Sequence, residues 1–386
     1  MNNNMLKFSN LFGAAIIIGF AVHSAPARAN TTRPGINLAQ LVATVNALKA
    51  EQQTDQESIS ALQSQLFFDE VTIVDQNSKI ASLQAKTAPI SVSGTDLTIT
   101  GMNVHIVSGS GSTNDNGTLT GRGNLIIGYN EMRKDNTDSR VGSHNLILGY
   151  ENNYSGCGGC VMGDYNTISG SLSSVVGGFE NTANGYLCSI SGGYGNTTTG
   201  TYSSVSGGEG NTASGEWSSV NGGVGNTAIA SWSSVSGGSV NRTFGVYSSI
   251  SGGHGNTANG DYSSVSGGYS NTADGNHSSI SGGHGNRATG DYSSISGGRS
   301  NAAKGLYSSI SGGFLNGVIG ESSWIGGGDS NSASGDYSSI SGGSRNTVAG
   351  LDSSISGGGG LTENDVVGWA AGSQTEIFIG GNFSSP

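Results

Sequence analysis

The sequence predicts an all-β parallel β-roll or β-solenoid of 15-residue turns, preceded by an α-helical coiled coil. Three observations predict this fold. Glycine accounts for 68 of the 386 residues, more than twice its usual share of about 7%. One motif repeats every 15 residues from 172 to 358. Before it, residues 38–86 contain no glycine and carry apolar residues at heptad spacing.

The composition excludes several classes of protein. Hydrophobic residues make up only 34% of the chain and charged residues 11%, both low for an α/β enzyme, and the low charge also argues against simple disorder. Scarce proline (4 residues) and the lack of glycine at every third position exclude collagen. A net charge of −11 without basic clusters predicts no nucleic-acid partner.

The N-terminus predicts a secretory signal peptide over residues 1–29. Lys7 precedes an apolar run at residues 11–22, and an Ala-Arg-Ala cleavage triplet ends at Ala29. The run is short for a membrane span, and an uncleaved signal anchor is the alternative. We therefore expect a mature chain without a membrane span, secreted or displayed at the cell surface.

The glycine-free stretch at residues 38–86 predicts a coiled-coil stalk. With Leu38 at heptad position a, ten of the fourteen a and d residues are apolar, as in the seam of a coiled coil. A single amphipathic helix lying on the head is the alternative. A long helix with one apolar seam needs partners, so we expect a homo-oligomer. The a and d residues are Leu38, Leu41, Val45, Leu48, Gln52, Asp55, Ile59, Leu62, Leu66, Asp69, Ile73, Gln76, Ile80 and Leu83.

The repeat has the consensus Tyr-Ser-Ser-Ile/Val-Ser-Gly-Gly-x-x-Asn-Thr-Ala-x-Gly-x, numbered below as positions 1 to 15. The aliphatic residue at position 4 and the asparagine at position 10 recur without a miss. A fixed short period is typical of a solenoid, and 15 residues are too few for a helical repeat. The glycine pair and the β-branched residue instead predict two short strands per turn, with turns stacked in parallel about 4.8 Å apart.

Stacked turns would align identical residues into ladders. We expect the Ile/Val ladder and the facing alanines to form the core, and the asparagine ladder to satisfy buried backbone groups. One Ile or Val and one Ala per turn contribute on the order of 3 kcal/mol, against roughly 1.5 kcal/mol for ordering each residue. Such thin turns predict further burial against sister chains. The alanines include Ala183, Ala213, Ala258, Ala273 and Ala333, and the asparagines include Asn211, Asn226, Asn256, Asn271 and Asn286.

Three further segments are predicted around the regular repeats. Residues 88–120 are predicted to be a β connector between stalk and head, because stretches within residues 89–108 alternate polar and apolar residues. The β-roll head spans residues 121–358, and the related motifs beginning at Asn124 and Asn145 predict early turns separated by a polar insertion. Residues 359–386 depart from the period and predict a C-terminal cap.

Position 1 of the repeat is mostly aromatic. If position 4 points inward, strand alternation turns positions 1, 3 and 5 outward. The result would be an exposed aromatic stripe flanked by hydroxyls, suited to sugar rings or protein surfaces. Alternatively, the rings pack between chains or stack on one another. The residues of the stripe are Tyr202, Trp217, Trp232, Tyr247, Tyr262, His277, Tyr292, Tyr307 and Tyr337.

The remaining reactive residues predict no catalytic or metal site. Cys157 and Cys160 form a lone Cys-x-x-Cys pair, which predicts a local disulfide or two spare thiols, and Cys188 is left to pair with either or to be buried. His254 and His284 share a position two turns apart, too far for one metal ion. No nucleophile elbow, P-loop or zinc-hydrolase motif occurs, so we expect no enzyme and no cofactor.

The repeat resembles a known family of head domains. Residues 213–222, Ala-Ser-Gly-Glu-Trp-Ser-Ser-Val-Asn-Gly, resemble the head repeats of YadA-like trimeric autotransporter adhesins. The resemblance covers residues 120–358 and, for a stalk, residues 38–86. It implies a trimer with a left-handed parallel β-roll head on a coiled coil, which binds host matrix or other surfaces. Here the turn is one residue longer, the stalk precedes the head, and we expect no C-terminal membrane anchor.

Three functions follow as hypotheses. The first is a secreted or surface-exposed, adhesin-like fibrous protein that attaches to glycan or extracellular matrix through its head. The second is a structural spacer or matrix solenoid without a specific ligand. The third is an ice-binding β-solenoid, although its strands have Ser-Ser-Ile-Ser instead of ranked Thr-x-Thr, and an aromatic residue would interrupt the face.

Overall fold

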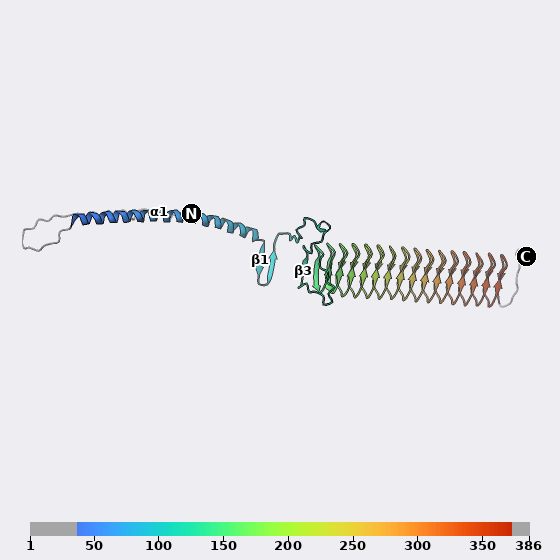
Figure 1. Cartoon of the computed structure of the whole chain (residues 1–386). Helices are drawn as coiled ribbons and strands as arrows, with labels where there is room; N and C mark the ends of the chain where they lie inside the picture. Colours follow the sequence, from blue (N-terminus) through green and yellow to red (C-terminus); the bar gives the residue numbers. More distant parts are fainter. Residues whose placement is uncertain (1–36, 373–386) are drawn as a thin grey trace, which may run out of the picture. The chain divides into compact units, whose positions relative to one another are not determined.

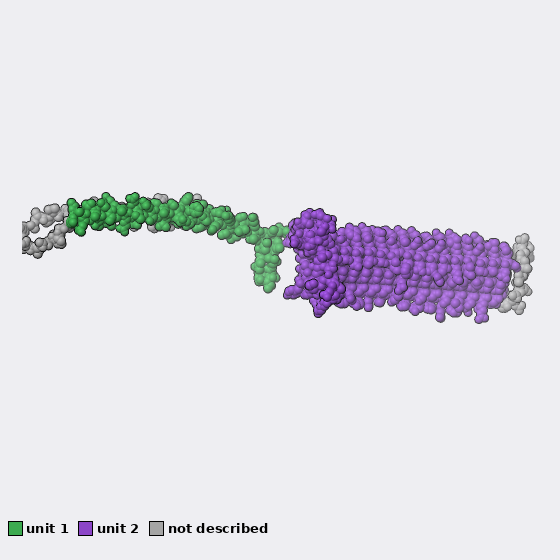
Figure 2. All heavy atoms as spheres, viewed as in Figure 1, with its two compact units in different colours: residues 1–103 green, residues 104–386 purple. Residues whose placement is uncertain are grey.

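The computed structural model describes residues 37–372, which fall into two compact units that divide between residues 103 and 104 (Figures 1 and 2). The predicted signal peptide and the last part of the predicted cap, residues 373–386, lie outside the described residues. The first unit contains one helix and a β-hairpin, and the second consists of stacked β turns.

The predicted stalk is a single helix, α1 (Leu38–Thr87). Asn37 caps its N-terminus, because the side-chain Oδ1 accepts a hydrogen bond of 3.0 Å from the backbone N–H of Ala39. No residue of α1 is buried, and the apolar residues of its seam range from 42% exposed at Val45 to 72% at Leu38. The helix is confirmed, whereas its assembly into a coiled coil remains a prediction.

Two further features of α1 concern its surface. Five large apolar residues outside the a and d positions are also exposed, namely Val42, Phe67, Phe68, Val71 and Val74. Within residues 37–372, α1 included, there is no helix with the length and hydropathy needed to cross a membrane.

The connector contains the predicted strands as an antiparallel hairpin of β1 (Ile90–Ser93) and β2 (Asp96–Ile99). Gly94 has a φ of 60°, which suits the first position of a two-residue hairpin turn. All eight strand residues are exposed.

The second unit is a parallel β-solenoid in which each regular turn supplies one strand to each of two sheets (Figure 1). Strands of the first sheet carry the position-4 residue and pair with the equivalent strands of the turns before and after. They are β3 (Leu125–Ile127), β4 (Leu146–Tyr150), β6 (Cys160–Asp164), β8 (Ser174–Val175), β10 (Ser189–Ile190), β12 (Ser204–Val205), β14 (Ser219–Val220), β16 (Ser234–Val235), β18 (Ser249–Ile250), β20 (Ser264–Val265), β22 (Ser279–Ile280), β24 (Ser294–Ile295), β26 (Ser309–Ile310), β28 (Trp324–Ile325), β30 (Ser339–Ile340), β32 (Ser354–Ile355) and β34 (Trp369–Ala370).

The second sheet carries the position-12 residue and has 15 strands in sequence order. A single bridging residue at position 8 of each turn forms a third parallel column between the two sheets. The strands are β5 (Asn153–Tyr154), β7 (Thr167–Ile168), β9 (Thr182–Ala183), β11 (Thr197–Thr198), β13 (Thr212–Ala213), β15 (Thr227–Ala228), β17 (Arg242–Thr243), β19 (Thr257–Ala258), β21 (Thr272–Ala273), β23 (Arg287–Ala288), β25 (Ala302–Ala303), β27 (Gly317–Val318), β29 (Ser332–Ala333), β31 (Thr347–Val348) and β33 (Thr362–Glu363).

The solenoid has its interior within a single chain. The Ile/Val ladder at position 4 and the alanines at position 12 are buried, as predicted; Val220 and Ala213, for example, are fully covered. Serine at position 2 and asparagine at position 10 are buried as well. The thin core expected from the sequence counted only two side chains per turn, whereas each regular turn buries four.

The early turns differ in length from the regular ones. β3 pairs with β4 in the predicted register, Leu125 opposite Leu146. Leu146 then pairs with Cys160 and Cys160 with Ser174, so these two turns have 14 residues. From Ser174, which pairs with Ser189, the turns have 15.

The predicted insertion after β3 contacts the first turns of the solenoid. It contributes Arg133, which is only 8% exposed. The Arg133 guanidinium donates hydrogen bonds to the carbonyl oxygens of Glu151 and Asn166 at 2.8 and 2.9 Å and lies 4.0 Å from the centre of the Tyr165 ring. The charged side chain therefore satisfies backbone groups at the first turns of the second sheet.

At the C-terminal end, the prediction that the period breaks at residue 359 is wrong. β33 and β34 form one further turn, with Ala370 paired to Ile355. What changes there is the residue type, because Leu361 replaces the ladder asparagine and Glu363 replaces the core alanine, and both are buried. The last described turn thus ends the ladders while keeping the backbone register.

Candidate functional site

The aromatic residues of position 1 lie at a corner of the turn, not on a strand. Tyr202, Trp217 and Tyr262 have φ values of 57–59°, in the left-handed region that bulky residues rarely adopt. A backbone hydrogen bond holds this conformation; the N–H of Tyr262 donates to the carbonyl oxygen of Val246 at 2.8 Å. The rings are exposed, as predicted. The predicted reason, alternation along a strand, is wrong, because these residues do not belong to a strand.

The rings stack on one another along the solenoid, which was the alternative to a free stripe. Centroids of Tyr202 and Trp217 lie 3.9 Å apart, those of Trp217 and Trp232 5.1 Å, and stacking continues through Tyr247 at 5.8 Å. The remaining members, Tyr262, His277, Tyr292 and Tyr307, follow at 4.7–5.0 Å.

Stacking determines which part of each ring a ligand can reach. A ring inside the ladder has a neighbour on both faces, so it offers its edge and any hydroxyl, and a sugar cannot stack on its face. Exposure ranges from 37% at Tyr202 to 56% at Tyr337. The turn before Tyr337 has Ser322 at position 1, so Tyr337 stands apart from the stack.

Beside this ladder, the first sheet presents two ranks of serine. Position 3 is serine in every turn from Ser174 to Ser309 and is half-buried, while position 5 is exposed and serine from Ser191 to Ser311 except at Asn221. Position 15, which is also on the surface, changes from turn to turn. Among the described residues, no serine hydroxyl of these two ranks takes part in a hydrogen bond; further along position 5, Ser356 accepts one from the Trp369 indole at 2.9 Å.

A second aromatic column at position 8 was missed by the sequence analysis. Tyr269 stacks between the two histidines of that position, 5.1 Å from His254 and 5.0 Å from His284. Phe179 and Tyr194 stack at 5.8 Å near the start of the array. Aligning position 8 across the turns would have shown the recurring rings, but charged residues interrupt the column and weaken that signal.

The asparagine ladder has the geometry that a structural role requires. Oδ1 of Asn256 accepts a hydrogen bond from the N–H of Asn271 at 2.9 Å. Its Nδ2 donates to the carbonyl oxygens of Gly252 and Gly268 at 3.0 and 3.1 Å. The same pattern recurs along the array, for example in Asn211, Asn226 and Asn286. The side-chain amides of the ladder hydrogen-bond to backbone groups and are therefore not available to bind a ligand.

A second hydrogen-bonded column of acids and amides occupies position 15. Oδ1 of Asp261 accepts from the N–H of Val246 at 2.8 Å, and Oδ1 of Asn276 accepts from the N–H of Asp261 at 3.0 Å. Asp291 accepts from Asn276 in turn at 2.9 Å. These carboxylates therefore bind the neighbouring turn's backbone.

All three cysteines are free thiols in the structure. Cys157 and Cys160 are partly exposed and adopt the spare-thiol alternative, without a disulfide. Cys188 is buried at position 2, and the hydroxyl of Thr198 donates to its sulfur at 3.1 Å. Burial raises the pKa of the Cys188 thiol.

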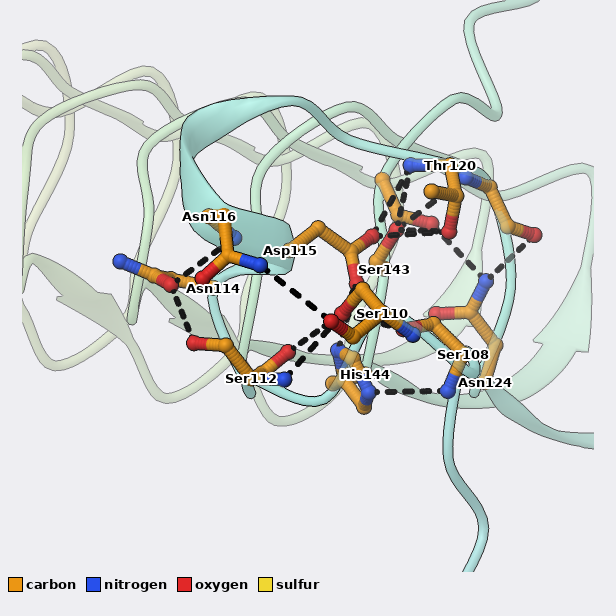
Figure 3. Close-up of polar contacts among 12 residues, drawn as sticks. Ser108, Ser110, Ser112, Asn114, Asp115, Asn116, Thr120, Asn124, Ser143 and His144 are labelled. Carbon is orange, nitrogen blue, oxygen red and sulfur yellow. Dashed lines mark hydrogen bonds and ion pairs between the residues drawn. The ribbon is translucent and has the colours of Figure 1, made fainter.

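A cluster of polar side chains precedes the first turns (Figure 3). Asp115, in the short helix η1 (Asp115–Gly117), is 3% exposed and accepts hydrogen bonds from the hydroxyls of Ser108, Ser110 and Thr120. These hydrogen bonds hold the pKa of the Asp115 carboxyl well below its usual range, and the bond from Ser108 has the largest effect. Nδ1 of His144 lies 3.9 Å from Asp115 Oδ1.

This cluster combines Asp, His and Ser but lacks the geometry of a catalytic triad. Nε2 of His144 accepts a hydrogen bond of 3.1 Å from the backbone N–H of Ser108, so it is occupied and does not face a hydroxyl nucleophile. The Ser108 hydroxyl is bound to Asp115 instead. A cavity of about 710 Å³ beside the cluster is lined by apolar residues such as Ile106 and Leu125 together with polar residues such as Thr113. The arrangement ties residues 108–120 to the start of the solenoid.

Within residues 37–372, no group of three or more His, Cys, Asp or Glu side chains is arranged to hold a metal ion. Neither the protein-family models nor the curated proteins compared with this chain give a match. The stacked parallel strands define the class as a β-solenoid repeat protein.

Proposed function

We propose that this chain is a secreted or cell-surface, adhesin-like fibrous protein that attaches through its solenoid. The observation that carries the proposal is the aromatic ladder from Tyr202 to Tyr307, which lies at the corner beside the serine ranks. It offers ring edges and hydroxyls at the same spacing over successive turns. A glycan or matrix protein with a repeating surface would make the same weak contact many times, and multivalency would raise its overall affinity.

The proposal includes membership of the YadA-like group and a trimeric state. The repeat motif, a parallel solenoid with a buried aliphatic ladder and the two 14-residue turns before Ser174 support the resemblance. The exposed a and d residues of α1 support assembly, because a 50-residue helix without a buried side chain needs partners. Export by the signal peptide would place this assembly outside the cytoplasm. No catalytic activity is part of the proposal.

A binding array of glycans and matrix proteins tests the function. We expect saturable binding by the exported chain, residues 30–386, and its loss in the double variant Trp217→Ala, Trp232→Ala. The matched control is Tyr269→Ala, His284→Ala, which removes stacked rings from the second column and should retain binding. If no saturable ligand is found, the structural spacer becomes the better hypothesis.

One observation favours ice binding as a second candidate. The objection that an aromatic residue interrupts the serine face does not hold, because position 1 lies at the corner. Positions 3 and 5 form two ranks of hydroxyls. Within a rank, hydroxyls of successive turns are about 4.8 Å apart, and the two ranks are roughly 6.6 Å apart along the strand direction. An ice-recrystallisation assay checks this candidate. Ser251→Tyr, on the face, should abolish inhibition of recrystallisation, whereas Thr257→Tyr, on the second sheet, should not.

A further inference from the structure

The β1–β2 hairpin has one wholly apolar face. Ile90 pairs with Ile99 and Val92 with Leu97, and these two cross-strand pairs lie on the same side of the hairpin because side chains alternate along a strand. The other side carries polar residues only, Ser91 opposite Thr98 and Ser93 opposite Asp96.

This apolar face is uncovered in the single chain. Ile90 and Ile99 are 45% and 40% exposed, and Val92 and Leu97 at the turn end are 73% and 65% exposed. A two-stranded hairpin with such a face is at best marginally stable alone in water. Four apolar side chains on one side and four polar ones on the other therefore indicate a surface that another element covers.

The position of the hairpin in the chain indicates which element that is. Only Ala88 and Pro89 separate the end of α1 from β1, and two residues span at most about 7 Å. The seam of α1 continues to within two helical turns of the hairpin, at Ile80 and Leu83, both at least 50% exposed. Helices packed along such a seam lie about 8–10 Å apart, so the hairpins of neighbouring copies would be adjacent.

We propose that the apolar face of the β1–β2 hairpin is an interface between copies of this chain, in which Val92 and Leu97 of each copy pack against the same face of its neighbours. The proposal rests on the homo-oligomer proposed above, and it adds a second contact that does not use the coiled-coil heptads. The hairpin would lock the register of the copies where the helical seam ends.

Disulfide cross-linking tests this interface and the coiled coil separately. The background is the exported chain with Cys157→Ser and Cys160→Ser, which removes the two partly exposed thiols; Cys188 is buried and stays. Val92→Cys probes the apolar face, Thr98→Cys is the matched control on the polar face of the same hairpin, and Leu62→Cys reports on the helical seam. Covalent dimers are measured on non-reducing gels after mild oxidation, at two protein concentrations.

We expect Val92→Cys to cross-link at least about tenfold faster than Thr98→Cys, at a rate independent of dilution. If Leu62→Cys cross-links and Val92→Cys is no faster than Thr98→Cys, the hairpin interface is wrong and the coiled coil stands. Cross-linking of Val92→Cys alone supports the interface and contradicts the coiled coil. If neither variant cross-links, the oligomer is wrong, and the interface with it.

Discussion

The solenoid and the helix–hairpin unit solve the problem of burial in opposite ways. Each regular turn of the solenoid covers its own Ile/Val, Ala, Asn and Ser side chains, and hydrogen bonds to the turns on either side. In α1 and the hairpin, every side chain of the regular elements is at least partly exposed. The first region can therefore be stable as one chain, whereas the second exposes apolar side chains that the proposed homo-oligomer would cover.

Breaking the helical seam should have the largest effect, and only on assembly. Leu62→Asp places a charge at a d position, and we expect the mass in solution to fall from about three chains to one. Gln63→Asp, one residue further along, should leave the mass unchanged. Light scattering on a sizing column measures both, and the solenoid's thermal unfolding should not move. A wild-type monomer would show that α1 needs no partner.

Within the solenoid, neighbouring glycines provide a matched test of backbone packing. Gly268 has a φ of 88°, and a Cβ there would lie 2.2 Å from the carbonyl oxygen of Gly283; at Gly267 a Cβ would meet nothing within 4 Å. We expect Gly268→Ala to destabilise the local turns by about 3 kcal/mol or more, and Gly267→Ala to be nearly neutral. Hydrogen exchange of adjacent turns reports the difference. Equal effects of the two substitutions would mean that the backbone geometry described for Gly268 is wrong.

Removing one asparagine of the ladder should destabilise the solenoid less than Gly268→Ala does. Asn256→Ala removes one acceptor and two donor bonds from buried backbone groups, and we expect a loss of about 2–3 kcal/mol. Asn259→Ala is the surface control, because Asn259 is exposed and its side-chain amide donates only to the Asp274 carboxylate. Protection of the Asn271 amide against hydrogen exchange should fall in the first variant and not in the second.

The smallest effect is a pH dependence confined to the start of the head. Hydrogen bonds, chiefly from Tyr165, lower the pKa of Asp135 to about 2. The hydrogen bonds to Asp115 lower the pKa of Asp115 still more. Both folded-state values are below the unfolded value of about 4, so their stabilisation is complete above pH 4 and is lost as the pH falls towards 2. Proteolysis of residues 104–140 with an acid-active protease should increase over that range, while the array at 172–358 stays protected. Asp135→Asn should shift the onset of cleavage, and an unchanged onset would contradict this assignment.

The period of the sequence was enough to predict the solenoid core. A strict 15-residue repeat with Ile or Val at position 4 and Asn at position 10 predicts parallel strands and stacked ladders, because any residue repeated at the length of one turn must meet its own copies. The glycine-free heptads likewise predicted α1, since local spacing alone sets which residues share a helix face.

The surfaces were decided by tertiary structure. Trp217 lies at a corner and not on a strand because its φ is 58°, a value that the alternation of strand residues does not predict. This corner position brings the rings of successive turns into stacking contact. The burial of Ser203 and the extra turn ending at Ala370 also required the closed path of the chain. Sequence determined what repeats, through local spacing; the backbone path determined what each repeated side chain touches, because that depends on residues a full turn away.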